Sequence, residues 1–122
     1  MKSFKDFLIE TKENISHKLV DMKIINEMAT LAAKSDGVGF IARIYSNDHE
    51  PAHMHILDYN NKKLAKVLLS GNTPSKINDF QFLDGELDRD MLKKLLKWAK
   101  GNNEEGFNNW IYSFSVWKSE HK

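Results

Sequence analysis

The hydrophobic pattern changes its period twice along the chain, and these changes divide the chain into three regions. From residue 4 to residue 33, apolar side chains recur every three to four positions, which predicts a helical extension over residues 1–36. Few apolar residues fall between residues 10 and 18, so two helices fit as well as one. Such an apolar stripe should be covered, either by the rest of the chain or by a second copy, so that the protein forms a homo-oligomer. The contact residues that we expect are Phe4, Phe7, Leu19, Met28 and Leu31.

A strand-like pattern follows and lasts to residue 83. Residues 40–45, 53–58 and 63–70 have the β-branched, aromatic and alternating composition of strands, and residues 77–83 can hold a short fourth strand. Residues 35–39 read as a loop with two glycines. Residues 59–62 read as a hairpin turn, because asparagine tolerates positive φ. This pattern predicts a small antiparallel sheet of three to four strands.

The last region is predicted to be helical. Asp88 begins a helix whose apolar residues recur along one side, and Gly101 ends it. Aromatic residues from 107 to 117 also recur at helical spacing, although residues 110–117 would alternate equally well as a strand. The predicted fold class is therefore α+β: an antiparallel sheet packed by C-terminal helices over residues 37–122, plus the N-terminal helical extension. The three tryptophans are expected in the core rather than as stacking platforms.

Composition narrows the function classes. The 122 residues carry 18 basic and 17 acidic side chains, so the net charge is close to zero and does not favour binding to nucleic acid or to an anionic membrane. The lysines between residues 93 and 100 are expected to form a solvated helix face, with a nucleic-acid surface as the alternative. There is no cysteine, which excludes disulfides and thiolate metal sites. The chain has neither an apolar run long enough for a transmembrane helix nor the apolar core of a signal peptide, so we expect a cytoplasmic protein.

Candidate chemistry gathers in residues 47–55, which hold three of the five histidines. In a strand, His53 and His55 point to the same side, about 6.6 Å apart along the chain. A histidine pair of this kind can chelate a divalent metal such as zinc, with His49 of the preceding turn as a third ligand. Asp48 or Glu86 would then supply a carboxylate. Two alternatives remain. The imidazoles have a structural role and hydrogen-bond the turn and the strand ends, or they recognise an anionic partner.

Arg43 lies on the strand before this segment, and Asp48 is the turn residue nearest to it. We expect an Arg43–Asp48 pair to hold the turn, or Asp48 to accept hydrogen bonds from backbone N–H groups of its own turn. Arg43 could instead bind a phosphate or a carboxylate. The candidate ligand-binding residues are Arg43, Asp48, His49, His53 and His55, and the candidate metal ligands are His49, His53 and His55.

The run from Ile44 to His55 resembles the signature of a small bacterial and phage family called domain of unknown function 4160. That signature is an aspartate–histidine pair, a proline-rich step and two histidines separated by one apolar residue. Further matches follow in order at residues 83–87, 97–99 and 109–110, so the resemblance covers about residues 38–112. Ala52 stands where the family usually has a second proline. The resemblance implies a compact unit of a few antiparallel strands plus helices, often encoded beside mobile elements or in toxin–antitoxin-like pairs, and it implies no particular reaction.

A second resemblance concerns residues 1–10, which end in Leu8, Ile9 and Glu10. This segment is similar to the targeting peptide of internal head proteins in some tailed phages, which a prohead protease cuts after a hydrophobic-x-Glu triplet. It implies cleavage after Glu10 and a place inside the virion.

Three functions remain open from the sequence. The first is a non-enzymatic accessory module of a mobile element, phage or toxin–antitoxin-like system that acts through a protein partner, with nucleic acid as a weaker alternative. The second is a metal-dependent hydrolase or nuclease that uses His49, His53 and His55 to activate a water molecule. The third is the capsid-internal protein. No glycine-rich phosphate loop and no nucleophile elbow are present.

Overall fold

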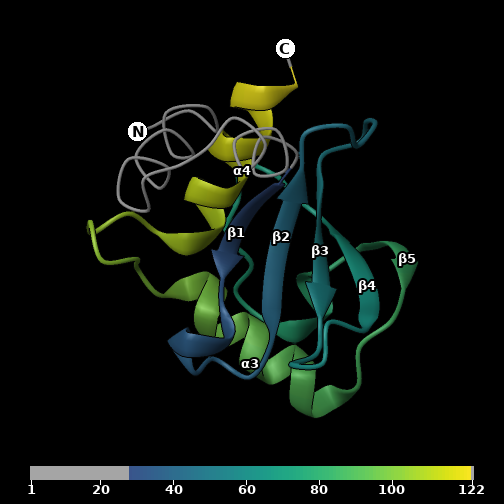
Figure 1. The fold of residues 1–122 in the computed structure, drawn as a ribbon. Helices are drawn as coiled ribbons and strands as arrows, with labels where there is room; N and C mark the ends of the chain where they lie inside the picture. The colour runs from purple at the N-terminus through teal and green to yellow at the C-terminus, as the bar shows by residue number, and fades with distance from the viewer. Residues whose placement is uncertain (1–27, 122) are drawn as a thin grey trace, which may run out of the picture.

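The computed structural model describes residues 28–121 (Figure 1). Five strands form one antiparallel sheet in the order β1-β2-β3-β4-β5, so that each strand pairs with its neighbour in the sequence. The strands are β1 Met28–Ala32, β2 Ile41–Tyr45, β3 His53–Leu57, β4 Lys63–Leu68 and β5 Phe82–Gly85. Two helices follow, α3 Arg89–Lys100 and α4 Asn109–Glu120, and short 3₁₀ turns span Lys34–Asp36 and Ile77–Asp79. The predicted α+β class is confirmed, with five strands rather than three to four.

The additional strand is β1, and here the helical prediction is wrong. Residues 28–32 pair with β2, with Ala29 opposite Ile44 and Thr30 opposite Arg43. A bulge between Thr30 and Ala32 breaks the alternation, so the two buried positions, Ala29 and Ala32, lie three residues apart. That spacing imitates the period of a helix. The sheet therefore begins inside the segment that was assigned to the extension, whereas residues 1–27, with Phe4, Phe7, Leu19 and the predicted cleavage after Glu10, lie outside the described residues.

The other predicted elements are found close to their expected bounds. β2, β3 and β4 coincide with the three predicted strands, and the predicted fourth strand appears later, as β5, after the turn Ile77–Asp79. Residues 109–120 are helical, so the alternative strand at 110–117 is wrong. Each helix begins at a polar cap: the Asp88 carboxylate accepts the Met91 N–H, and the Asn108 side-chain oxygen accepts the Ile111 N–H.

The helices pack on one face of the sheet and enclose the core (Figure 1). Alternate strand residues point into it, and the aromatic rings of Phe40 and Trp98 meet edge to face at 5.7 Å. The core residues of the central strands are Ala42, Ile44, Met54, Ile56, Ala65 and Val67. Trp98, Trp110 and Trp117 are buried, as predicted. In the part of the chain from residue 28 to residue 121, no helix is long and apolar enough to cross a membrane.

The opposite face of the sheet carries mixed chemistry. Ile41 lies opposite Leu57, and both are buried outside the helix-packed core. At the next pair on the same face, two residues along β2, Arg43 lies opposite His55, and His55 lies opposite Lys66. This face therefore presents basic and imidazole groups in one row across β2, β3 and β4.

Candidate metal centre

The turn between β2 and β3 directs Asp48 towards β3. The Asp48 N–H donates to the Tyr45 carbonyl at 3.2 Å, and the Asp48 Oδ2 accepts the Tyr45 N–H at 3.3 Å. These reciprocal contacts hold the carboxylate over the end of β2, which confirms the prediction that backbone groups of the turn bind Asp48.

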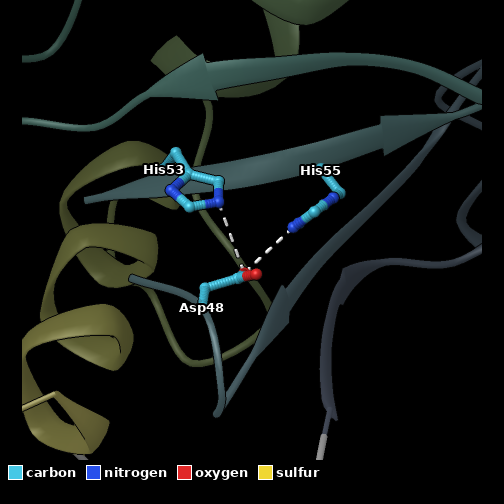
Figure 2. A group of neighbouring side chains, drawn as sticks. All are labelled: Asp48, His53 and His55. Atoms are coloured by element: carbon cyan, nitrogen blue, oxygen red, sulfur yellow. Dashed lines mark hydrogen bonds and ion pairs between the residues drawn. The ribbon is translucent and has the colours of Figure 1, made fainter. Parts of the chain in front are cut away.

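His53 and His55 lie on the same side of β3, as strand alternation predicted, and Figure 2 shows Asp48 reaching both from the turn. The His55 Nε2 lies 2.9 Å from the Asp48 Oδ2, and the His53 Nε2 lies 3.4 Å from the same oxygen. The two imidazole centroids are 5.2 Å apart. One ligand atom from each of the three residues lies within 4.8 Å of the other two.

The hydrogen bonds define which nitrogen of His53 carries a proton. The His53 Nδ1 lies 2.8 Å from the Pro51 carbonyl oxygen, which can only accept, so Nδ1 is the donor. In the neutral imidazole, Nε2 then carries a lone pair and points towards the Asp48 carboxylate. This Nε2 is buried and has no hydrogen-bond partner. The neutral form of His53 therefore offers a lone pair 3.4 Å from the Asp48 Oδ2, whereas the protonated form would make an ion pair with it.

Burial of the cluster favours the neutral form of His55. His53 and His55 are 2% and 6% exposed, and the Asp48 side chain is 15% exposed. Burial lowers the pKa of His55 below its ordinary 6.5, and the attraction and hydrogen bond of Asp48 oppose this effect. The nearby His53 and Lys66 lower the pKa of His55 a little further. Neutral imidazole is the form that coordinates metals.

Aromatic side chains enclose the two imidazoles, and sequence reasoning had assigned them no role at the site. The Tyr45 ring meets the His55 ring edge to face at 4.7 Å, and the Trp117 ring lies 5.0 Å from His53. Trp117 also stacks on His121 at 3.6 Å. The alternation of β2 could have placed Tyr45 on the histidine face. No local signal connects Trp117 of α4 to β3, because the two segments lie more than sixty positions apart.

Three predicted site residues lie elsewhere. His49 is exposed and is not a member of the group, and Glu86 is exposed on the chain after β5. The predicted Arg43–Asp48 pair is wrong: the Arg43 guanidinium donates to the Asn61 Oδ1 at 3.4 Å, at the hairpin between β3 and β4. Tyr45 takes the place of Arg43, because its backbone N–H is already positioned beside the carboxylate.

These features define a class of protein. It is a small α+β domain whose β2–β3 turn brings a carboxylate close to two buried imidazoles. The family model of domain of unknown function 4160 matches residues 39–111, which include Asp48, His53 and His55, and the chain belongs to this family. β1 and most of α4, with Trp117, lie outside the matched range. No curated protein and no solved structure matches the chain.

Proposed function

We propose that this domain is an accessory binding module whose histidine turn holds one divalent transition-metal ion on Asp48, His53 and His55. The observation that carries the proposal is the convergence of three ligand atoms within 4.8 Å. Ligands around a tetrahedral zinc ion, with bonds of about 2.0–2.2 Å, lie about 3.3–3.6 Å from one another. The 3.4 Å between the His53 Nε2 and the Asp48 Oδ2 matches this separation. The 2.9 Å contact of His55 is shorter, and the three ligand atoms together span up to 4.8 Å, so the side chains would have to move closer to an even spacing when the ion binds.

The contacts of His53 support the same proposal. The His53 Nε2 is buried, makes no hydrogen bond and lies 3.4 Å from the Asp48 Oδ2, so a divalent ion between the two atoms would coordinate both. A divalent ion satisfies both groups and displaces the Nε2 proton of His55. The Pro51 carbonyl accepts the Nδ1–H of His53. Metal-bound histidines usually donate their second ring N–H to an acceptor of this kind.

The ligand set also indicates the kind of metal. Two imidazoles and one carboxylate suit zinc and the neighbouring first-row metals, whereas magnesium and calcium prefer oxygen ligands. A site of three protein ligands leaves at least one position, which a single water molecule can fill.

Burial favours a binding role over hydrolysis. A hydrolytic metal must admit both a water molecule and a substrate, yet the two imidazoles are almost completely enclosed and the carboxylate is only partly exposed. The metal-dependent hydrolase is therefore the second candidate. An accessory role in a phage, mobile element or toxin–antitoxin-like system stays a prediction, which the neighbouring genes would test.

The test is a metal titration of the full chain after treatment with a chelator. Zn²⁺ and Co²⁺ would be titrated by calorimetry, and the bound ions counted by native mass spectrometry. We expect one ion per chain for the wild type and for His49→Ala, and none for His55→Ala or Asp48→Asn. Co²⁺ should also quench Trp117, which lies beside His53.

A wild-type chain that takes up no ion, or a His49→Ala variant that loses it, would overturn the proposal. The hydrolase is tested in the same samples with a chromogenic phosphodiester. Zinc-dependent turnover that disappears in His55→Ala would favour the hydrolase over the binding module.

A further inference from the structure

A cavity of about 360 Å³ is lined by residues of β1, of α3 and of the loop that joins α3 and α4. Its volume is at the lower end of the range for small-molecule sites. Its apolar lining includes Leu31 of β1, Val38 and Trp98 of α3. None of the ligands of the proposed metal site lines it.

The β1 bulge contributes directly to this cavity. Thr30 and Leu31 both line it, although neighbouring strand residues normally point to opposite faces of a sheet. The register shift between Thr30 and Ala32 releases Leu31 from the alternation and turns it inwards. Bulges are often found where a strand must redirect a side chain beside a binding site.

The charged groups at this cavity all have the same sign. Asp36, Glu104 and Glu105 line it, and none of the described residues that line it is basic. The whole chain has nearly balanced charges, with 18 basic and 17 acidic residues. All three residues are exposed, and the Asp36 Oδ2 also accepts the Ala33 N–H at 2.7 Å. Together the three carboxylates give the surface at the cavity a negative potential, which attracts cations.

The loop that carries two of these carboxylates is ordered by its own hydrogen bonds. The Asn103 side-chain oxygen accepts the N–H groups of Glu105 and Phe107, both at 3.0 Å. The Asn103 N–H donates to the Phe107 carbonyl at 2.8 Å. Glu104 and Glu105 therefore start from a defined backbone, and binding needs little ordering of the loop.

We infer that this cavity binds a small organic cation, an ammonium or guanidinium group on a short apolar chain. The apolar chain would lie against Leu31, Val38 and Trp98, and the cationic head would face Asp36, Glu104 and Glu105. The ligand is either a free amine or a lysine or arginine side chain of a partner, because both present the same chemistry.

The experiment uses three probes with the same apolar chain and different head groups: hexylammonium, hexanol and hexanoate. Each is titrated into the isotope-labelled full chain and followed by the NMR shifts of amides 102–107 and of the Trp98 indole. We expect hexylammonium to shift these signals, hexanol to do so more weakly, and hexanoate to leave them unchanged. A short peptide with blocked ends, whose only charged side chain is one lysine, shows whether a side chain of a partner can also enter the cavity.

The matched variants remove two negative charges each. The double variant Glu104→Gln/Glu105→Gln should weaken hexylammonium binding roughly two- to tenfold, as expected for two exposed ion pairs. The control Asp84→Asn/Glu86→Gln removes the same charge from exposed residues that do not line the cavity and should leave the affinity unchanged. No shift with hexylammonium, equal binding of hexanol, or equal weakening in both double variants would overturn the inference.

Discussion

The two faces of the central strands are made by alternate residues of the same chain, yet they follow different rules. On the helix-packed face, Ile44, Met54 and Ile56 are fully buried, and they differ little in chemistry. On the other face, Arg43, His55 and Lys66 occupy one register row. On the first face the side chains matter mainly through the volume that they fill, and on the second face through their charge and hydrogen-bonding groups. Substitutions should therefore have large and general effects on the first face, and specific effects on the second.

The largest loss of stability is expected on the helix-packed face. Ile56→Ala removes three buried carbons beneath the helices and should lower the free energy of unfolding by about 2–5 kcal/mol. Chemical denaturation with a chelator present would measure it. Metal binding by the folded fraction should be retained, and a loss of less than about 1 kcal/mol would contradict this view of the face.

On the other face, His55→Ala should separate stability from chemistry. The change removes the partner of the Asp48 carboxylate and should destabilise the chelator-treated protein by about 1–3 kcal/mol. Metal uptake, by contrast, should be lost completely. Thermal melts with and without Zn²⁺ would show this, since only the wild type should gain melting temperature from zinc. A variant that melts like the wild type in both conditions would exclude both the structural and the metal-binding roles.

On the helix-packed face, loss of a helix cap should lower the free energy of unfolding by an intermediate amount. The Asn108 side chain accepts the Ile111 N–H and donates to the Ala99 carbonyl, so it joins the ends of both helices. Asn108→Ala should cost about 1–2 kcal/mol of unfolding free energy. Asp88→Ala, which removes a cap with a single hydrogen bond to Met91, should cost about 1 kcal/mol. Urea unfolding of the two variants side by side tests the order.

Between pH 7.5 and pH 5, we expect His55 on this second face to make the stability depend on pH. Because burial lowers the pKa of His55 below 6.5, the unfolded chain binds its proton more readily than the folded chain does. The stability of the metal-free protein should therefore fall as the pH drops from 6.5 through the pKa of folded His55, and then level off. In His55→Gln this contribution should be absent. Unfolding free energies measured between pH 7.5 and pH 5 would show the difference, and equal slopes for the two proteins would contradict it.

The smallest effect is expected at Lys66. Lys66→Gln changes a partly exposed side chain and should alter stability by less than about 0.5 kcal/mol. It also removes one cause of the lowered pKa, so the pKa of His55 should rise slightly. An NMR titration of the imidazole signals measures this, with Lys76→Gln as a control on a residue that does not affect His55. A fall in the pKa of His55 would show that Lys66 acts on the site in some other way.

Much of the site could be predicted from local rules. The alternation of a strand places His53 and His55 together, and the turn before Pro51 brings Asp48 near them. The choice between Asp48 and His49 could not be made in this way. Both residues lie in the same turn, and only the Tyr45 backbone N–H, which binds Asp48, decides which side chain points inwards.

The central strands, the helix after Asp88 and the common side of the two histidines could be predicted from the sequence, because each depends on a period of two or 3.6 residues along the chain. The same periods left residues 110–117 open between a helix and a strand, and the structure shows a helix there. The tertiary structure alone decided that residues 28–32 form a strand, since a bulge gave their buried positions the spacing of a helix. It also decided that Trp117 encloses His53 and that Asp36 and Glu105 meet at one cavity. Those contacts join segments far apart in the chain, and their energy depends on packing between elements, which no local pattern encodes.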